Sequence, residues 1–316
     1  MSDIQLFRYS PSGVSELSGK AATIEKELQS LIEANMEAFL GVRFLASEYS
    51  TGKTHRGRID SLGLDENNCP VIVEYKRHSN ENVINQGLFY LDWLQDHQAE
   101  FRWLVMDKLG KETAECIDWL GTRLLCIAAD FNKYDQHAVQ QINRNISLIR
   151  YKLFSEDLLM FELVNAITEK LLQPTMFADV QPNIQAKLVE TAATERHDLH
   201  QNRIAIASPE LLSLYQEVCD YSESLGDDVQ RKELKFYTAF QKIKNFVSLQ
   251  IWAPQRDPQL RLYLKLNPRE VELSKGFIHD VTDKGHWGTG NLEIIIRTKD
   301  DLDKAKILIE RSYQEN

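Results

Sequence analysis

The sequence predicts a mixed α/β protein of the α+β type, and three observations support this prediction. The chain has 316 residues, of which 43% are hydrophobic and 27% are charged, so it is long enough for two globular domains of ordinary composition. The hydrophobic pattern of its first half predicts a helix, three strands, a helix and a further strand, an αβββαβ order. A second, shorter set of helices and strands follows, and it predicts a second, smaller α+β domain.

Changes in composition mark the boundaries of these domains. Residues 1–165 contain the first set of elements. In residues 166–207 Gln, Asn, Thr and His are frequent, and Pro174 and Pro182 interrupt short amphipathic pieces, so we expect a part-helical linker there. Residues 208–316 form the predicted C-terminal domain, for which binding of nucleic acid or of a partner is a hypothesis.

The elements of the first domain follow from apolar periodicity and from the residues that start or end them. Residues 1–20 show no clear periodicity, although Pro11 to Gly13 predict a turn. Thr23 is a suitable N-cap for the first helix, and Gly41 is a typical residue to end it. The further predicted strands and helices are Val42–Tyr49, Arg58–Leu64, Val71–Lys76, Val83–Leu94, Ala99–Leu109, Arg123–Ala129, Tyr134–Ile142, Ile146–Leu153 and Leu158–Val164.

The most informative stretch contains two predicted strands joined by a turn, which is typical of a β-hairpin. The first strand begins at Arg58, alternates between apolar and polar residues, and carries Asp60. The second strand, Val71–Lys76, follows a run of turn-forming Asp, Glu and Asn residues. Glu74 and Lys76 are two residues apart, so they share one face of this strand, and Asp60 approaches them from the neighbouring strand.

This grouping of charged side chains has a chemical interpretation. Two carboxylates, here Asp60 and Glu74, raise each other's pKa unless a cation lies between them, and a hard divalent ion supplies that cation. With the Lys76 ammonium beside them, the arrangement predicts a magnesium site for phosphodiester hydrolysis. The spacing by itself is more often that of a solvated strand face, since Glu and Lys commonly alternate on exposed strands.

The same stretch resembles the PD-(D/E)XK nuclease superfamily, and within it the NucS-type endonucleases, over roughly residues 20–165. The shared motifs are G-x-I-D, a hydrophobic run into E-x-K, and a helical Gln followed by aromatic residues. In this chain they fall on Gly57 to Asp60, Val71 to Lys76, and Gln86 with Tyr90 and Trp93. No Pro precedes Asp60, although Pro is common there within the superfamily.

The resemblance implies a restriction-endonuclease-like core and a set of catalytic residues. Asp60, Glu74 and the backbone carbonyl of Tyr75 would hold Mg²⁺ or Mn²⁺. Lys76 would orient the attacking water and offset charge in the transition state, and Gln86 would hold the nucleophile or a phosphate oxygen. The predicted function is therefore that of a metal-dependent nuclease, and we expect it to be a DNA endonuclease.

The resemblance also implies an acidic residue on the first helix, and the basic residues beside the hairpin suggest a contact with nucleic acid. Glu27 is the best match for the acid, but Glu25 fits the helical wheel at least as well, so the choice of Glu27 rests on the resemblance. Basic residues around the hairpin are expected to meet the phosphate backbone, the alternative being a solvated hairpin end. These residues are His55, Arg56, Arg58 and Arg77.

DNA is the expected partner, with RNA as an alternative, and a homodimer is compatible with the cutting of both strands. A second hypothesis comes from another class of function. In it, the nuclease fold binds nucleic acid or a partner protein without cutting, as a non-catalytic module.

The composition limits the remaining classes of function. The net charge of -10 argues against an extended basic surface that coats DNA, but not against a local cleft. No apolar run is long enough to span a membrane, and the N-terminus lacks the pattern of a secretory signal. The four cysteines are scattered, as is usual for free thiols in a reducing compartment. We therefore expect a cytoplasmic protein with no membrane partner. The G-K-T at residues 52–54 lacks the upstream glycine of a phosphate-binding loop.

In the C-terminal domain we expect a helix that starts at Ser208, strands at Leu260–Leu266 and Leu292–Ile296, and a final helix, Asp300–Tyr313. The domain resembles a poorly characterised one that is appended to such nuclease modules, which implies architecture and little function. Two of its stretches have a composition that suits binding.

Arg231–Lys275 has ten Lys or Arg against four Asp or Glu and is interleaved with aromatic residues. This is typical of a surface that holds single strands, or of a core with a solvated charged face. The glycine-rich loop Lys284–Gly290 either approaches a ligand or turns the chain into the next strand. His279, Asp280 and His286 do not have a diagnostic metal-ligand spacing.

Overall fold

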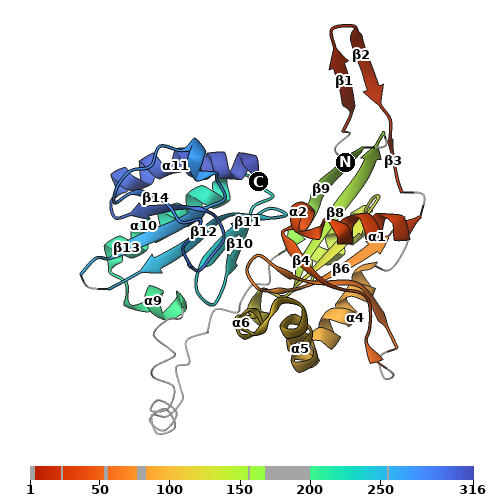
Figure 1. Cartoon of the computed structure of the whole chain (residues 1–316), viewed down its shortest axis with the longest axis horizontal. Coiled ribbons are helices and arrows are strands. Elements are labelled where there is room, and N and C mark those ends of the chain that lie inside the picture. The colour runs from red at the N-terminus through yellow and green to blue at the C-terminus, as the bar shows by residue number, and fades with distance from the viewer. Residues whose placement is uncertain are drawn as a thin grey trace. The chain divides into compact units, whose positions relative to one another are not determined.

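The computed structural model describes residues 4–22, 24–52, 56–76, 83–155, 157–167, 200–254 and 256–316. Their contacts divide the chain into two compact units, Met1–Ile167 and Thr168–Asn316, each with its own sheet and core (Figure 1). Thr23, His55, Arg77 and most of the predicted linker lie outside the described residues. Among the described helices, none has the length and apolar character needed to cross a membrane.

A seven-stranded mixed sheet forms the centre of the first unit, with the order β3-β8-β7-β6-β5-β4 and β9 paired to β8. β4, β5 and β6 are antiparallel, β6, β7 and β8 are parallel, and β9 and β3 run antiparallel to β8. The strands are β3 (Gly19–Lys20), β4 (Val42–Ser50), β5 (Arg58–Asp65), β6 (Pro70–Lys76), β7 (Arg123–Ala128), β8 (Asn145–Phe154) and β9 (Leu158–Ile167).

The helices occur between these strands in the predicted order, and the αβββαβ succession is confirmed as α1-β4-β5-β6-α4-β7. The predicted first helix is two helices in the structure, since the chain bends at Asn35. Gly41 ends the second of them in the left-handed conformation, at φ 64°. The helices of this unit are α1 (Glu25–Ala34), α2 (Met36–Leu40), α4 (Val83–Asp96), α5 (Gln98–Leu109), α6 (Lys111–Glu115) and α7 (Lys133–Gln140).

One element of the first unit was not expected from the sequence. β1 (Leu6–Ser10) and β2 (Gly13–Leu17) form an antiparallel hairpin around the predicted turn (Figure 1). Both strands are almost wholly exposed, so they lack the alternation between buried and exposed residues by which a strand is recognised.

The core of the first unit fixes the central strands. Ile72 of β6 and Leu124 of β7 pack with the apolar side of α4, whereas Tyr75, on the other face of β6, points toward α1. Six of the seven residues of β6 are buried, and Lys76 is the exception. Such burial is typical of a strand in the middle of a covered sheet. The carboxyl end of β6, where Glu74 lies, therefore emerges from a rigid support.

The second unit is built on a six-stranded antiparallel sheet with the order β10-β11-β12-β13-β15-β14. Its strands are β10 (Gln230–Glu233), β11 (Thr238–Gln241), β12 (Asn245–Trp252), β13 (Gln259–Leu264), β14 (Ile278–Asp280) and β15 (Leu292–Ile296). Its helices are α9 (His200–Ile206), α10 (Pro209–Ser224) and α11 (Lys299–Glu315). The N-cap predicted at Ser208 is confirmed, because its hydroxyl accepts a hydrogen bond from Leu211 N at 3.3 Å.

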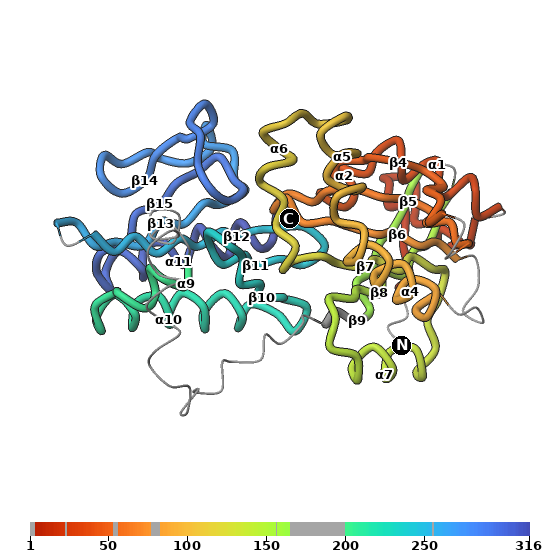
Figure 2. The backbone as a smooth tube through the Cα atoms, turned by 90° about the horizontal axis from the view of Figure 1, so that it is seen from below, coloured from red at the N-terminus to blue at the C-terminus, as the bar shows by residue number. Residues whose placement is uncertain are grey.

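Two helices cover one face of this sheet. Leu249, Leu262 and Ile294 lie opposite one another on adjacent strands and belong to one core with apolar residues of α10 and α11. Figure 2 shows the path of both helices beside these strands. The alternate residues, among them Gln250 and Arg261, must then face the opposite way. The short helix α9 also packs on β12 and buries His200, although the sequence assigned this segment to the linker.

Candidate functional site

The predicted carboxylates meet where β5 and β6 separate. The ladder between these strands ends at the pair Ser61 and Val73, and beyond it side chains replace backbone partners. The backbone N–H of Asp60 donates to Glu74 Oε1 at 3.2 Å, and the N–H of Tyr75 donates to Asp60 Oδ2 at 3.0 Å. The two carboxylates therefore lie side by side at the carboxyl end of β6.

Burial makes the charge of both groups unfavourable. The Glu74 side chain is fully buried, and desolvation, with repulsion from Asp60 as the next cause, raises its pKa to about 9. Desolvation also raises the pKa of Asp60, against the hydrogen bond from Tyr75 and the attraction of Lys76. Glu74 Oε2 is buried and accepts no hydrogen bond from any of the described residues. A site of this kind is incomplete without added positive charge.

Lys76 supplies part of that charge. Its side chain is only 12% exposed, and its Nζ lies 3.6 Å from Oε1 of Glu25. The ammonium lowers the pKa values of Asp60 and Glu74 by attraction, but burial outweighs it and both remain raised. Because Glu25 takes up part of the lysine charge, Lys76 balances only part of the negative charge of the two carboxylates.

The acid that α1 brings to this site is Glu25, and the choice of Glu27 needs correction. Glu25 pairs with Lys76 and acts on the pKa of Asp60, whereas Glu27 is exposed. Two residues along a helix turn a side chain by about 200° around its axis. The two glutamates therefore point to different sides of α1, and only one of them can face the sheet.

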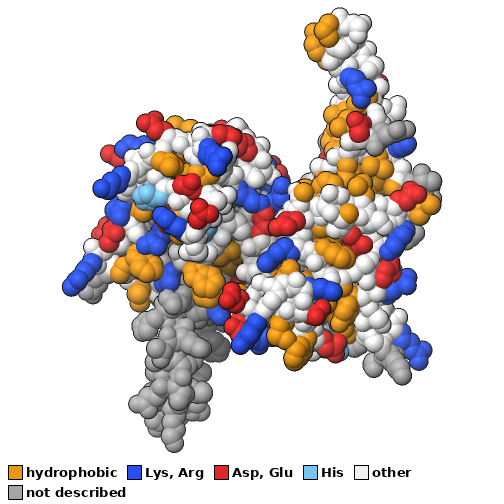
Figure 3. Space-filling model, in the orientation of Figure 1, with side chains coloured by type: hydrophobic (Ala, Val, Ile, Leu, Met, Phe, Trp, Pro, Cys, Tyr) orange, Lys and Arg blue, Asp and Glu red, His pale blue; other side chains and the backbone are white. Residues whose placement is uncertain are grey.

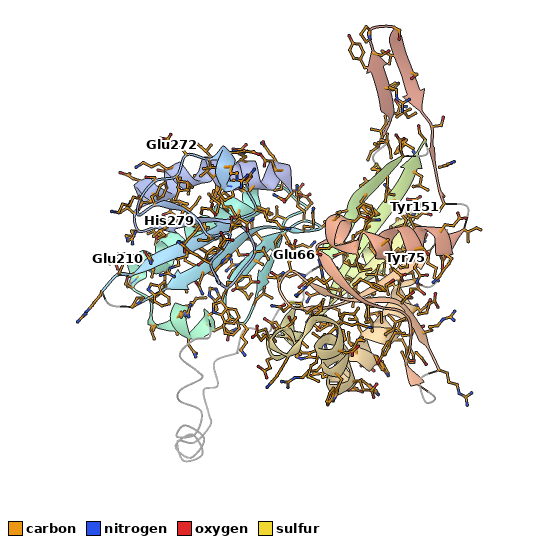
Figure 4. The ribbon with its side chains drawn as sticks, viewed as in Figure 1. Glu66, Tyr75, Tyr151, Glu210, Glu272 and His279 are labelled. Atoms are coloured by element: carbon orange, nitrogen blue, oxygen red, sulfur yellow. The ribbon has the colours of Figure 1, made fainter. Side chains whose placement is uncertain are left out.

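The same helix holds the backbone of the site in place. Gln29 is buried in α1 and donates from Nε2 to the carbonyl oxygen of Asp60 at 2.9 Å. Glu33, one turn further, accepts from Ser61 Oγ at 2.6 Å, and that hydroxyl also lies 3.2 Å from the Tyr75 hydroxyl. Tyr75 is labelled in Figure 4. These contacts fix β5 and β6 on both sides of the point where they separate.

Gln86 lies on α4 and is linked to the start of β5 through Tyr90. Its Nε2 donates to the Tyr90 hydroxyl at 3.3 Å, and this hydroxyl accepts from the backbone N–H of Arg58 at 3.1 Å. A Cβ at Gly57 would lie 2.5 Å from Cε1 of Tyr90, so the glycine of the G-x-I-D motif makes room for this ring. The structure thus connects the helical Gln and the aromatic residue to the first strand; the catalytic role of Gln86 stays a prediction.

The structure describes two of the four basic residues predicted to contact nucleic acid, Arg56 and Arg58. Arg56 and Arg58 are exposed at the start of β5, and Arg58 forms an ion pair with Glu48. Glu48 also accepts from Lys26 Nζ at 3.0 Å, and it adds to the negative charge that raises the pKa of Asp60. Their role toward nucleic acid stays a prediction.

Glu48 is the site residue that sequence reasoning missed. Its backbone is in the left-handed region, at φ 52°, in a β4 strand that also carries a bulge after Phe44. Both features break the alternation from which the direction of a side chain is predicted. The helical wheel suits Glu25 as well as Glu27, so it includes the right residue but does not decide between the two.

The donor set fits a hard divalent cation. Two adjacent carboxylates with raised pKa values and the buried Oε2 of Glu74 are oxygen ligands of the kind that Mg²⁺ and Mn²⁺ take. Within the described residues no group of three or more His, Cys, Asp or Glu side chains forms a metal cluster. A cation here would have two carboxylate ligands, and Mg²⁺ commonly takes one or two and keeps several waters.

Comparison with known proteins gives relatives of limited similarity. An uncharacterized protein of Haemophilus influenzae is 25% identical over 323 residues, which cover 99% of this chain and 100% of that protein. No family model matches the sequence.

Two solved structures resemble part of the chain. A repair endonuclease from Pyrococcus abyssi matches at 17% identity and a TM-score of 0.28, over 43% of this chain and 50% of that one. An EndoMS–dsDNA2 complex matches at 18% identity and a TM-score of 0.25, over 43% and 51%. The chain thus covers about half the length of each of these structures. Matches of this size do not specify chemistry, which depends on the side chains of the site.

Proposed function

We propose that the first unit is a divalent-metal-dependent nuclease that hydrolyses phosphodiester bonds of DNA. The observation that carries the proposal is the pair of carboxylates, Asp60 and Glu74, held side by side with Lys76 at the end of a buried strand. Burying like charges together is unfavourable unless a ligand of opposite charge binds there. A structural role for the pair would be served better by uncharged residues.

In this proposal the chain supplies position and charge. Asp60 and Glu74, with the backbone carbonyl of Tyr75 beside them, would hold Mg²⁺ or Mn²⁺. When bound, such a cation polarises a phosphodiester and makes water a better nucleophile at neutral pH. Lys76 orients that water and stabilises negative charge on the phosphate as it develops, and Glu25 holds the Lys76 side chain in place.

The surroundings of the carboxylates suit a polyanionic substrate. Arg56 and Arg58 are exposed beside Asp60 and would meet the phosphate backbone, and Gln86 would contact a phosphate oxygen from α4. This local basic contact agrees with a chain whose net charge is -10, because a nuclease needs positive charge only where the backbone passes.

The test is cleavage of labelled single-stranded and double-stranded DNA by the full chain with Mg²⁺ or Mn²⁺. We expect Asp60→Asn and Lys76→Met to reduce the rate at least about a hundredfold, because each removes a group that acts in the transition state. Glu27→Gln is the matched control, since it removes a carboxylate from the same helix at an exposed position and should leave the rate unchanged.

Two results would contradict the proposal. One is cleavage at the parental rate by folded Asp60→Asn and Lys76→Met proteins. The other is a pure parental protein that binds DNA and does not cut it with either metal, which would leave the non-catalytic binding module as the function. Calorimetric titration with Mn²⁺ separates these cases, because a nuclease requires metal binding that Asp60→Asn weakens.

A further inference from the structure

One carboxylate and two basic side chains form a cluster beside the proposed cation site. Glu48 accepts a hydrogen bond from Lys26 Nζ through its Oε1 atom, at 3.0 Å, and its Oε2 atom forms an ion pair with Arg58 Nε. The three residues belong to three different elements, α1, β4 and β5. The carboxylate of Glu48 therefore bridges two cations that come from distant parts of the chain.

The pairing of β4 with β5 places this cluster next to Asp60. Paired residues lie on either side of Glu48 in the ladder between the two strands, so Glu48 is level with Asp60. Arg58 and Asp60 are two residues apart on β5, so their side chains share a face and lie about 6.7 Å apart along the strand. A phosphate bound at Arg58 would therefore be close to a phosphate bound at the carboxylates.

Gln29 connects the cluster to the backbone of the site. Lys26 Nζ donates a second hydrogen bond to Gln29 Oε1 at 3.2 Å. The amide of the same Gln29 donates from Nε2 to the carbonyl oxygen of Asp60 at 2.9 Å. The position of the lysine ammonium is thus linked, through one side chain, to the strand that carries Asp60.

Glu48 has a backbone conformation that is unfavourable for a residue with a Cβ atom. Its φ of 52° lies in the left-handed region, where Cβ comes too close to the following carbonyl oxygen. Conformations of this kind persist where the surrounding contacts hold them, and they are concentrated at functional sites. Desolvation raises the pKa of Glu48, but the hydrogen bond and charge of Lys26 and the charge of Arg58 lower it below its ordinary value. Glu48 is therefore ionised where it bridges the two cations.

The two cations are open to a further anion. The side chains of Lys26 and Arg58 are 55% and 69% exposed, whereas that of Glu48 is 30% exposed. An ammonium has three N–H donors and a guanidinium has five. The hydrogen bonds to Glu48 and Gln29 use two donors of the lysine, and the ion pair with Glu48 uses Nε of the arginine. The solvent-facing donors of both groups suit the oxygen atoms of a phosphate.

We propose that Lys26 and Arg58 together bind the DNA phosphate next to the one that is cut, and that Glu48 is the positioning residue that holds them. This inference rests on the proposed nuclease function and adds Lys26 and Glu48 to it. Two cations on long, flexible side chains repel each other and lose freedom when they are fixed, and a carboxylate between them offsets the repulsion. A carboxylate also repels a phosphate, so Glu48 favours binding only if its hold on the cations outweighs that repulsion.

The test is the affinity of the full chain, in its Asp60→Asn form, for a fluorescent double-stranded oligonucleotide, measured by anisotropy at several salt concentrations. We expect Lys26→Ala and Arg58→Ala each to weaken binding about threefold to tenfold and to reduce the salt slope by about one. Lys26→Arg keeps the charge and should restore most of the affinity. Lys111→Ala is the matched control, because this lysine of α6 is 77% exposed and pairs with Glu115, and it should change neither quantity.

Glu48→Gln separates positioning from simple repulsion, because the two effects have opposite signs. Removal of a negative charge beside DNA would by itself tighten binding. Loss of positioning weakens it, and we expect the Glu48→Gln protein to bind about threefold more weakly than its parent. Added to the double variant Lys26→Ala with Arg58→Ala, Glu48→Gln should cause no further weakening, since Glu48 acts through these two residues.

The possible outcomes decide between this proposal and its alternatives. Equal or tighter binding by the Glu48→Gln protein overturns it, as does unchanged binding by folded Lys26→Ala and Arg58→Ala proteins. Failure of the parent to bind the oligonucleotide also overturns it. If the expected pattern of binding is found but the unsubstituted chain does not cut DNA, the phosphate site stands and the nuclease fails. If the unsubstituted chain cuts DNA and these variants bind like their parent, only the phosphate site fails.

Discussion

The two units gather side chains of opposite charge on sheets of different construction, the first mixed and the second antiparallel. In the first, Asp60 and Glu74 are brought together beside Lys76, which also pairs with Glu25. In the second, Arg203 and Arg261 share one aromatic ring. The carboxylates of the first unit therefore suit a cation, whereas the second unit gathers guanidinium groups around an aromatic ring.

The net charge of the chain does not show how its charged side chains are distributed. A value of -10 for the whole chain argues against a protein that coats nucleic acid, and on the face seen in Figure 3 acidic and basic side chains are interspersed. Basic side chains can still gather locally, as Arg203 and Arg261 do around the ring of Trp252. Global charge therefore excludes an extended basic surface and leaves a specific pocket open.

The largest effect should come from Glu74→Gln, which separates activity from stability. It removes a proposed cation ligand, so we expect DNA cleavage to fall at least about a hundredfold. The folded pKa of Glu74, about 9, lies above its ordinary value of 4.5. The stability that this group contributes is therefore complete below the unfolded pKa and is lost as the pH rises toward the folded pKa.

Gln cannot ionise, so near pH 8 and with a chelator present the variant should be more stable than the parent, by about 1–3 kcal/mol. Near pH 4 the two proteins should unfold at similar temperatures. Thermal unfolding at both pH values measures this difference. A variant that is less stable at pH 8 would show that the carboxylate is stabilised where it lies and needs no cation.

The first site could be predicted from the sequence because its residues are close along the chain. Asp60, Glu74 and Lys76 belong to one hairpin, and strand alternation alone brings them to one face. Glu25 could not be chosen with confidence over Glu27, because the rotation of a helix about its axis depends on packing. Glu48 could not be predicted at all, since its φ of 52° breaks the strand pattern.

The arginine cluster around Trp252 could not be assembled from the sequence, although the composition of its region suggested binding. The region Arg231–Lys275 was correctly recognised as basic and aromatic, but only the register of β12 and β13 shows that Gln250 and Arg261 share a face. Arg203 lies on α9, in a segment that had been assigned to the linker. Its contact with Trp252 joins residues far apart in the chain, which no local pattern specifies.

An intermediate effect should distinguish the two glutamates of α1. Glu25→Gln removes the partner that holds Lys76, so we expect the rate of cleavage to fall about tenfold, as is usual when a supporting residue is lost. Glu27→Gln should have no effect. The measurement is the single-turnover cleavage rate as a function of pH. Loss of Glu25 changes the surroundings of Lys76 and should shift this pH–rate profile. A merely structural defect would lower the rate without shifting the profile. The reverse ranking would restore Glu27 as the acid of the site.

The smallest effect concerns His200, whose titration gives the second unit the opposite pH dependence. The ring is fully buried, with Nε2 2.9 Å from Thr238 Oγ1, and desolvation lowers its pKa to about 4, against the attraction of Glu233. The unfolded chain binds this proton near pH 6.5, so the stability contributed by neutral His200 is present above that pH and is lost as the pH falls toward 4.

We therefore expect the second unit to lose about 1–2 kcal/mol between pH 6.5 and pH 5, and His200→Gln to reduce that slope. His137→Gln, at an exposed position, should not change it. Hydrogen exchange at each pH measures the two units separately, because each amide reports on its own surroundings. Since Glu74 makes the first unit less stable as the pH rises, the two units should respond to pH in opposite directions. Parallel slopes would show that the buried carboxylate and the buried imidazole do not control the stability of their units.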